Sequence, residues 1–529
     1  MYMTINKKLD DLTISSKSHP QHYMLHKYWG RKPHNLVRDY IELFTKTGDT
    51  VLDPFMGSGG AVIESNKLKR IGIGVDLNPM ACLIVNETLK KELDFDKLVK
   101  EFNNIVNGIP DEVNKLAYTK DKNGQFQLID NAIWEHGKIS RIKYYQDKKR
   151  NIKDADEYDQ LTVITATKLL AKYEKSGMIS FPRDEIMTYV RRSGKHHINE
   201  LFTDRNLLFA AFFMTGVKKV KNKHIRESLT LIFTSALPNF SSMIPGDINT
   251  VNGKSGWQIS KFWVPQIHSE KNALNTLKLR LTKFINSKKE IDELSTDTSY
   301  KIMNQSSENL KNIPPKSVDY VFTDPPYGDS ISYFALSSFW SSWVHESVDY
   351  NNEIIYDPYR NKREEDYSRR LDRAFKQVHR VLKDKKYMSF TFHNRHIKFW
   401  KIVIDAVYKT GFQLVNVKWV DQAVASGTQG INRKNTLRGD FVYTFRKINE
   451  SLYENNIVSG EKIIDETIEK LLEKNSHVTT AKLYESLIPE IIKNQAYYDS
   501  DGKLLDIDKY IAKKYVYTLQ GDGYYGWTI

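Results

Sequence analysis

Short apolar runs alternate with amphipathic stretches near the start of the chain. Residues 32–46 place apolar side chains at helical spacing, and residues 49–55 form an apolar run that predicts a buried strand. A glycine-rich turn, a helix over 61–69 and a second apolar strand over 71–76 follow. Strands that alternate with helices in this way indicate a parallel sheet.

The same alternation returns after residue 316. An apolar strand at 317–324 is followed by predicted helices at 330–346, 363–383 and 397–410, and by predicted strands at 386–393, 412–420 and 440–446. The pattern therefore indicates α/β architecture on both sides of a long middle block.

The remaining parts of the chain follow other patterns. Residues 1–20 are polar and predict no regular element, and residues 141–153 are basic with two tyrosines. The middle block also contains predicted helices at 204–220, 222–236 and 270–292. The tail after residue 450 is predicted to be mostly helical. No internal repeat is present in the sequence.

Composition narrows the class of protein. The net charge of +14 over 529 residues favours a polyanionic partner, and 40% hydrophobic residues exclude a mainly disordered chain. No run approaches the ~18 apolar residues that span a bilayer, so we expect no membrane association. The single cysteine, Cys82, excludes an intrachain disulfide and a cysteine-built zinc site. We expect no metal and a reducing, cytoplasmic setting.

The first candidate site is the glycine-rich turn VLDPFMGSGG at 51–60. Small residues between a strand and a helix let backbone N–H groups approach a ligand closely, although such a turn also serves packing alone. Asp76 ends the next predicted strand, where a carboxylate typically accepts hydrogen bonds from ribose hydroxyls. Together they indicate a nucleotide-like ligand at the carboxyl ends of the strands.

The second candidate site is Asp324-Pro325-Pro326-Tyr327, directly after a predicted strand. Two consecutive prolines stop the strand and fix the backbone, which leaves the Pro325 carbonyl free to accept a hydrogen bond. Asp324 adds a second acceptor and Tyr327 a flat apolar face. This group suits an exocyclic amino group on a stacked base, while a plain strand-end turn is the alternative.

Together the two motifs resemble the amino-group (N6-adenine) DNA methyltransferases of the DPPY type, which use S-adenosyl-L-methionine. HKYWGRKPHNLV at 26–37 looks like the cofactor-contacting segment that precedes the loop in this family. FTDRNLL at 202–208, FTSAL at 233–237 and SGTQGINRKNTLRGDFVYTF at 426–445 resemble a bacterial adenine-specific branch. Relatives often carry a Gly-Asp pair where this chain has Gln305-Ser306-Ser307, so we carry over no base-pocket acid there.

The resemblance implies a methyltransferase-type (Rossmann-like) α/β fold: a mostly parallel sheet with a reversed last strand, a large middle insertion and a helical C-terminal tail. It divides the chain into 1–100 and 300–449 as the two parts of the catalytic domain, 101–299 as a candidate target-recognition region, and 450–529 as a helical region. The implied reaction is methyl transfer to the N6 amino group of a flipped adenine in double-stranded DNA.

The resemblance also implies roles for individual residues. Catalytic roles fall on Asp324, Pro325, Pro326 and Tyr327. Cofactor contacts are expected from Asp53, Pro54, Phe55, Gly57, Ser58, Gly59, Asp76, Asn78, His26, Tyr28, Trp29 and Arg31. Candidates for DNA contact, in a basic hairpin and a late polar loop, are Tyr144, Lys148, Lys149, Arg150, Gln429, Asn432, Arg433 and Lys434.

Other functions stay open at this point. The substrate could be the N4 amino group of cytosine or an adenine in RNA, and a catalytically silent DNA-binding subunit could use the same fold. The aspartate before the two prolines is the usual form in N6-adenine enzymes, whereas serine is commoner in N4-cytosine enzymes and asparagine in RNA enzymes. A role in restriction-modification or phage defence would imply a separate restriction endonuclease or defence subunit as partner.

Overall fold

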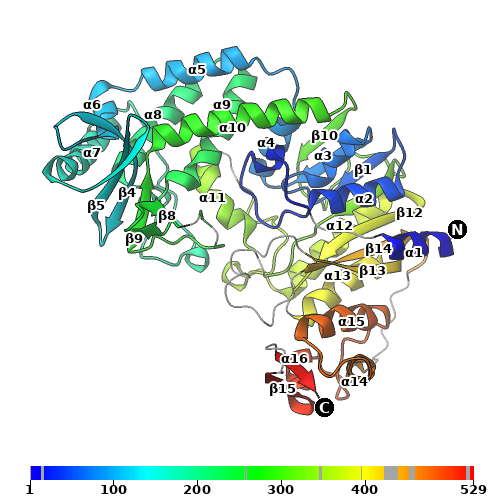
Figure 1. Ribbon diagram of the computed structural model, residues 1–529. Coiled ribbons are helices and arrows are strands. Elements are labelled where there is room, and N and C mark those ends of the chain that lie inside the picture. The colour runs from blue at the N-terminus through cyan, green and yellow to red at the C-terminus, as the bar shows by residue number, and fades with distance from the viewer. Residues whose placement is uncertain are drawn as a thin grey trace.

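The computed structural model describes residues 2–12, 17–254, 256–257, 259–329, 331–344, 348–394, 396–421, 439–451, 459–519 and 525–528. Figure 1 shows a central sheet flanked by helices, with the middle block at the upper left and the last helices at the bottom. The three parts follow the chain order that the sequence patterns indicate.

The central sheet has seven strands in the order β10 (Tyr300–Asn304), β2 (Ile71–Asp76), β1 (Thr50–Asp53), β11 (Val318–Thr323), β12 (Leu382–Phe392), β14 (Gly439–Lys447) and β13 (Phe412–Asp421). The pairs from β10 to β12 are parallel, and β14 runs antiparallel between β12 and β13. The predicted methyltransferase-type sheet with a reversed last strand is therefore confirmed.

Side chains of alternating residues divide the helices between the two faces of the sheet. Val51, Tyr320 and Phe322 pack against α1 (Tyr2–Asp11), α2 (His34–Phe44) and α3 (Gly60–Lys67). On the other face, Leu52 and Val321 pack against α12 (Glu364–Val381) and α13 (Ile397–Lys409). The expectation that residues 1–20 lack regular structure was wrong, because α1 buries Leu9 against the sheet.

The middle block combines helices with a second sheet. Its helices are α5 (Phe95–Asn107), α6 (Asp111–Asn114), α7 (Glu157–Lys175), α8 (Asp204–Lys219), α9 (Lys223–Phe240) and α10 (Ala273–Leu294). The antiparallel sheet contains β3 (Tyr118–Lys120), β4 (Phe126–Glu135), β5 (Lys138–Gln146), β6 (Lys149–Asp154) and β9 (Ile267–Lys271), with β9 on β4. A short pair follows α9, namely β7 (Gly246–Asp247) and β8 (Asn252–Gly253). The sequence patterns had not predicted this second sheet.

The middle block shares one apolar core with the catalytic half. Residues of α8 and α9 belong to the same cluster as α4 (Pro79–Leu89) and α11 (Tyr333–Val344), the helix that follows the Asp324 motif. The Trp343 ring of α11 meets Phe233 of α9 edge-on, with 5.2 Å between ring centroids. This core crosses the boundaries drawn after residues 100 and 299. The division of the chain into four regions therefore stays a prediction.

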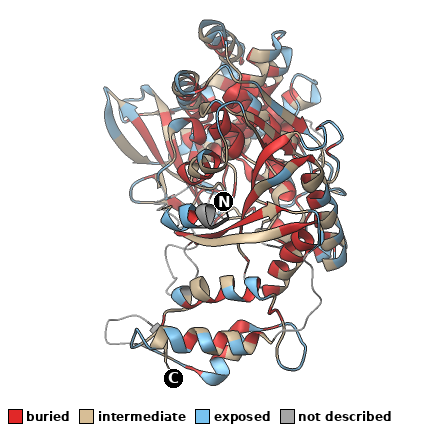
Figure 2. Cartoon of the chain, turned by 90° about the vertical axis from the view of Figure 1, so that its right-hand side faces the viewer, coloured by how far each residue is buried: buried red, intermediate tan, exposed pale blue. Residues whose placement is uncertain are grey.

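The tail adds a helical layer below the sheet, formed by α14 (Gly460–Leu472), α15 (Thr480–Lys493) and α16 (Ile507–Lys514). Ile464 and Leu487 are buried in the core under β12 and β14, while the outer sides of these helices are exposed (Figure 2). The chain then forms a hairpin of β15 (Val516–Leu519) and β16 (Tyr525–Thr528), which the prediction of a mostly helical tail did not include. Of the helices in the described ranges, none combines the length and the apolar character that crossing a membrane requires.

Trp343→Ala tests whether the two halves unfold together. Trp343 is 1% exposed, so removing its ring should lower the free energy of unfolding by about 3–5 kcal/mol. Hydrogen exchange should then show that amides of α9 and of α4 lose protection to a similar extent. Leu279→Ala on α10, at a side chain that is 64% exposed, is the control and should change stability by less than about 0.5 kcal/mol. Loss of protection confined to α11 would contradict the shared core.

Candidate active site

Two carboxylates hold the turn after β1 by accepting hydrogen bonds from its backbone amides. Asp53 Oδ1 accepts from the Phe55 amide at 3.1 Å, and Asp76 Oδ2 accepts from the Gly57 amide at 2.7 Å. Gly59, the N-cap of α3, has φ +80°, and a Cβ there would lie 2.4 Å from a methyl carbon of Val85. Only glycine fits this position, so the sequence dictates the tight turn.

Asp76 stands at the carboxyl end of β2. Its second oxygen, Oδ1, accepts from the Asn78 amide at 2.8 Å. The Asn78 side chain caps α4 through the Met80 amide and donates to Ser337 Oγ at 2.7 Å. Asn78 therefore lies behind the loop as a structural group, and its side chain does not line the cavity described below.

The Asp324 motif is brought beside this loop by the pairing of β11 with β1. Thr323 Oγ1 donates to Asp53 Oδ1 at 2.6 Å, across 270 residues of sequence. Asp324 Oδ1 accepts from Thr391 Oγ1 at 2.6 Å and from the Tyr327 hydroxyl at 2.5 Å. The Pro326 carbonyl accepts from the Tyr367 hydroxyl at 2.5 Å, whereas no donor within the described part of the chain reaches the Pro325 carbonyl.

Both motifs line one open cavity of about 1060 Å³, counted with the solvent at its mouth. Its walls include Tyr28, Trp29, Arg31, Asp53, Pro54, Phe55, Gly57, Ser58, Asp76, Ser306, Ser307, Asp324, Pro326 and Tyr333. Most of the predicted cofactor residues thus meet the predicted catalytic aspartate in a single space. Gly59, Pro325 and Tyr327 adjoin it through their neighbours without lining it themselves.

The segment before α2 forms another wall. Arg31 donates to Ser58 Oγ at 3.2 Å, to the His26 carbonyl at 3.1 Å and to the Tyr23 carbonyl, and burial lowers its pKa to about 10. The Trp29 indole N–H is buried without a hydrogen-bond partner in the described residues. His26 does not line the cavity, because its ring is buried against Trp340 and its Nε2 lies 3.2 Å from Thr234 Oγ1.

Buried carboxylates dominate the electrostatics of the cavity. Burial raises the pKa of Asp53 to about 7 and that of Asp76 to about 6, although both accept hydrogen bonds that act in the opposite direction. Burial also raises the pKa of Glu353 on the far wall, with Arg360 opposing it. Against these acids stand two buried cations, Arg31 and Lys32. A cavity rich in acids favours a ligand that carries positive charge.

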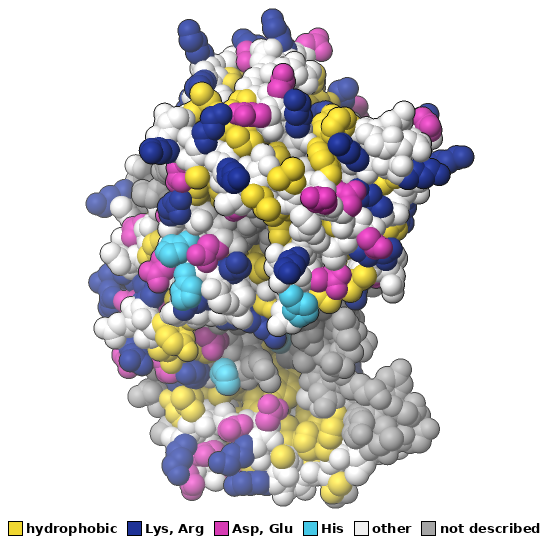
Figure 3. Space-filling view, turned by 90° about the vertical axis from the view of Figure 1, so that its left-hand side faces the viewer, with side chains coloured by type: hydrophobic (Ala, Val, Ile, Leu, Met, Phe, Trp, Pro, Cys, Tyr) yellow, Lys and Arg dark blue, Asp and Glu magenta, His cyan; other side chains and the backbone are white. Residues whose placement is uncertain are grey.

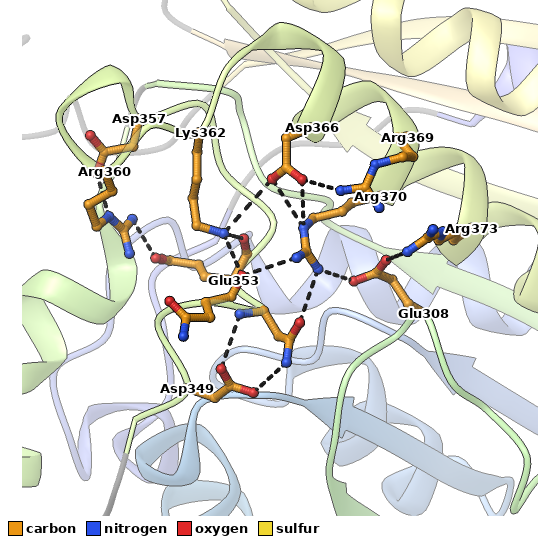
Figure 4. Close-up of polar contacts among 12 residues, drawn as sticks. Glu308, Asp349, Glu353, Asp357, Arg360, Lys362, Asp366, Arg369, Arg370 and Arg373 are labelled. Atoms are coloured by element: carbon orange, nitrogen blue, oxygen red, sulfur yellow. Dashed lines mark hydrogen bonds and ion pairs between the residues drawn. The ribbon is translucent and has the colours of Figure 1, made fainter.

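An ionic network holds the wall that carries Asn352 and Glu353 (Figure 4). Glu353 pairs with Arg360 at 2.6 Å, and Lys362 Nζ donates to the Glu353 carbonyl at 2.8 Å. Arg370 of α12 donates to Glu308 at 2.5 Å and to the Asn352 side chain at 3.3 Å. Because Glu308 directly follows Ser306 and Ser307, this network ties two walls of the cavity together.

The candidate DNA contacts lie elsewhere. Lys148, Lys149 and Arg150 are exposed where β5 turns into β6. The stacking role expected of Tyr144 does not fit the structure, because its ring is 6% exposed and packs with Ile129 and Ile142, whereas Tyr145 is 48% exposed. Gln429, Asn432, Arg433 and Lys434 lie outside the described residues.

The surface of the middle block carries many cations without concentrating them. Figure 3 views the end of the molecule formed by α6, α7 and β5, and shows Lys and Arg scattered among acidic and apolar side chains. The side chains visible on this face therefore form no continuous basic track for a nucleic acid.

Sequence comparison gives the family. The family model for N6 and N4 methyltransferases, described as DNA methylase, matches residues 6–87 and 318–499, which hold the glycine loop, Asp76 and the Asp324 motif. The chain belongs to this DNA methylase family. Methyltransferases of this family and fold use S-adenosyl-L-methionine.

Three relatives match parts of the methylase. Type II methyltransferase M.MjaII of Methanocaldococcus jannaschii is 22% identical over 342 residues, 60% of this chain and 62% of the relative. Type II methyltransferase M.HpaI of Haemophilus parainfluenzae is 32% identical over 126 residues, 23% of this chain and 40% of the relative. The probable type III restriction-modification enzyme HindVI Mod subunit of Haemophilus influenzae is 33% identical over 90 residues, which are 17% of this chain and 12% of the relative. Each match thus spans less than two thirds of the relative.

The residues present fit this cofactor, whose sulfonium and amino groups are cationic. The acid-rich cavity compensates positive charge, and Asp76 stands at the carboxyl end of β2, where a carboxylate typically accepts hydrogen bonds from hydroxyl groups. Sequence reasoning missed several residues of the cavity, namely Lys32, Ser306, Ser307, Tyr333, Asn352 and Glu353. Ser306 and Ser307 follow β10, which pairs in parallel with β2. A predicted strand over 300–304 would therefore have placed these two serines at the same sheet edge as Asp76.

Asp53→Asn tests the buried acid by its effect on stability. The pKa of Asp53 rises from 3.8 to about 7 on folding, so its contribution to stability is full below pH 3.8 and is lost as the pH rises through about 7. The variant should therefore be more stable than wild type at pH 8, by as much as about 4 kcal/mol, and equal to it near pH 4. Denaturant unfolding without cofactor at both pH values measures this. Asp96→Asn, at an exposed carboxylate on α5, is the control. Equal gains at both pH values would contradict the assignment.

Proposed function

We propose that this protein is a site-specific DNA methyltransferase that transfers a methyl group from S-adenosyl-L-methionine to the N6 amino group of an adenine flipped out of duplex DNA. The observation that carries the proposal is the single cavity shared by the glycine loop, Asp76 and Asp324. A methyl donor and an amino group have to meet in one space for direct transfer, and only such a cavity brings them together.

The cofactor, when bound, supplies an electrophilic methyl group on a sulfonium. In our proposal Asp76 accepts the ribose hydroxyls, and the loop from Asp53 to Ser58, with Tyr28, Trp29 and Arg31, holds the remainder. His26, Gly59 and Asn78 support this wall from behind, because their side chains or backbone fix α3, α4 and the segment before α2. Preorganised groups of this kind position the reactants without further rearrangement.

The chemistry at the amino group falls to the Asp324 motif. The lone pair of an exocyclic amino nitrogen is conjugated with the ring and is therefore a poor nucleophile. Hydrogen bonds from its two N–H groups to Asp324 and to the Pro325 carbonyl favour a pyramidal nitrogen and stabilise the positive charge that develops on it. Burial raises the pKa of Asp324 while Lys32 opposes this rise, so the carboxylate is also suited to receive the released proton.

The target base has to leave the duplex before it can reach the cavity, at a cost of about a few kcal/mol. Tyr327 offers a ring for stacking, and Pro326 fixes the backbone between it and Asp324. Lys148, Lys149 and Arg150 are our candidates for phosphate contact, and Gln429, Asn432, Arg433 and Lys434 for contact near the base.

Adenine is favoured over cytosine by the aspartate before the two prolines, through the family resemblance alone. A match to a Mod subunit of a restriction-modification enzyme supports a role in restriction-modification, with a separate endonuclease as partner. A catalytically silent subunit would have no need to keep Asp324 beside a Pro325 carbonyl that no donor reaches in the described part of the chain. RNA is the second substrate to test, since the same cavity would accept a base from it.

Labelled methyl transfer tests the function. Wild type with labelled cofactor should methylate unmodified plasmid, and sequencing at single-base resolution should locate N6-methyladenine at one sequence. Asp324→Ala should bind cofactor as wild type does and lose transfer by about 100-fold or more, because one preorganised acceptor is gone. If the label were found on N4 of cytosine, or only on RNA, the proposed substrate, adenine in DNA, would be wrong. Equal turnover by the variant would remove Asp324 from the proposed role.

Asp76→Ala addresses the cofactor. Loss of a charged acceptor for the ribose should raise the dissociation constant of S-adenosyl-L-methionine by about 10–100-fold, measured by calorimetry. Asp297→Ala, whose carboxylate is 98% exposed, serves as the control. Since Asp76 also holds the Gly57 and Asn78 amides, Asp76→Asn provides a variant that keeps an oxygen acceptor at this place. Unchanged affinity in the alanine variant would exclude the ribose contact.

A further inference from the structure

A lysine and a second aspartate lie beside the Asp324 motif. Lys32, in the segment before α2, donates to Asp440 Oδ2 at 2.9 Å and to the Tyr327 hydroxyl at 2.5 Å, and its Nζ lies 3.6 Å from Asp324 Oδ1. Asp440 is the second residue of β14. The side chains of Lys32 and Asp440 are only 10% and 8% exposed.

We propose that Lys32 and Asp440 are a positioning pair that sets the charge of Asp324 and the orientation of Tyr327. The inference deepens the proposed methyltransferase function and rests on it for its catalytic meaning. Lys32 lines the cavity, and the proposal assigns it to Asp324 and Tyr327, which it contacts, and not to the reacting atoms. Asp440 acts through its pairing with Lys32 and through its charge.

Burial makes the pair mutually dependent. A lysine that is nearly removed from water requires an acceptor for each of its three N–H groups, or its charge becomes costly. Asp440 and the Tyr327 hydroxyl take two of these, and Asp324 faces the third. Removing one partner of such a pair leaves an unpaired buried charge, so the arrangement resists rotation of any one member.

Tyr327 is fixed from three sides. Its hydroxyl accepts from Lys32 and donates to Asp324 Oδ1 at 2.5 Å, and its ring lies 4.7 Å from the Lys32 ammonium and meets Phe392 edge-on. The oxygen that Tyr327 occupies is one of the acceptors proposed for the amino group. When the substrate takes that oxygen, Lys32 still donates to the hydroxyl oxygen, so Tyr327 keeps one of its two hydrogen bonds.

The charges also predict opposite effects for the two members. Burial lowers the pKa of Lys32, but Asp324 and Asp440 outweigh burial and raise it, so the amine stays protonated. Lys32 favours the ionised form of Asp324, whereas Asp440 disfavours it. Among the described residues, Tyr327, Asp53 and Tyr333 also face Asp324. Tyr327, Tyr333, Tyr443 and His393 face Asp440, and His393 also faces Lys32. These groups are the same in every variant of the pair. The direction in which the pKa of Asp324 moves is therefore set by the charge that is removed, at Lys32 or at Asp440.

Lys32→Met and Asp440→Asn test the pair in the full-length protein. Titration of aspartate carboxyl ¹³C signals, with Asp324→Asn to assign the Asp324 signal, needs neither cofactor nor DNA. We expect Lys32→Met to raise the pKa of Asp324, Asp440→Asn to lower it, and Lys32→Arg to stay close to wild type. Lys398→Met, which breaks the 2.6 Å pair with Glu364 away from the cavity, is the matched control. Shifts of the same sign in both variants, or none, would overturn the proposal.

Single-turnover methyl transfer to plasmid gives the second measurement. Lys32→Met should reduce the rate by about 100-fold and move the acid limb of the pH profile to higher pH. Asp440→Asn should move that limb to lower pH, and Lys32→Arg should restore its position. A slower rate with an unmoved limb in every variant would mean a merely structural role and overturn the proposal. If wild type transfers no methyl to DNA while the carboxyl titration shifts as expected, the proposed function fails and the charge pairing stands.

Discussion

The parallel pairing of β1 with β11 is the constraint on which the site depends. Parallel neighbours end at the same edge of a sheet, so whatever follows each strand is delivered to one place. Here the glycine loop follows one strand and the Asp324 motif follows the other, and the Thr323–Asp53 hydrogen bond closes the space between them. The long middle block can intervene in sequence because it leaves from β2 and returns at β10, which are themselves paired.

Charge is the second organising feature of this methylase. Burying several carboxylates around one cavity is unfavourable by itself, as the raised pKa values of Asp53 and Asp76 indicate. Backbone amides, hydroxyls and two buried cations offset part of this cost, and a cationic ligand would offset more. Protonation near neutral pH also relieves part of this cost. The preference for a positively charged ligand agrees with the sulfonium cofactor of the family.

Much of the cavity could be predicted from sequence because its key residues sit in contiguous motifs at strand ends. Asp53, Asp76 and Asp324 needed only the strand pattern and the family resemblance. Lys32 could not be predicted, since one lysine in a basic segment gives no signal until folding places it beside Asp440, 408 residues away. His26 and Asn78 lie in the expected segments, but their side chains turn into the core.

The second sheet was missed for a different reason. Strands β5 and β6, KISRIKYYQ and KRNIKD, carry so many charges that their alternation is weak as a sequence signal. Which of Tyr144 and Tyr145 is exposed then depends on strand register, because neighbouring residues of a strand face opposite sides. Tyr144 faces inward and Tyr145 outward, and this parity is invisible until the pairing with β4 is known.

The return of the middle block to β10 has an evolutionary consequence. Because β2 and β10 are adjacent, the block can be replaced by another of different size without moving any strand that carries the cavity. A replacement would still have to present an apolar surface, like that of α9 around Phe233, to Trp343 and the rest of α11, and a partner like Trp257 to the cavity residue Trp29. Changes inserted at this junction can therefore alter the surface of the protein while the strand ends that carry Asp53, Asp76 and Asp324 keep their places.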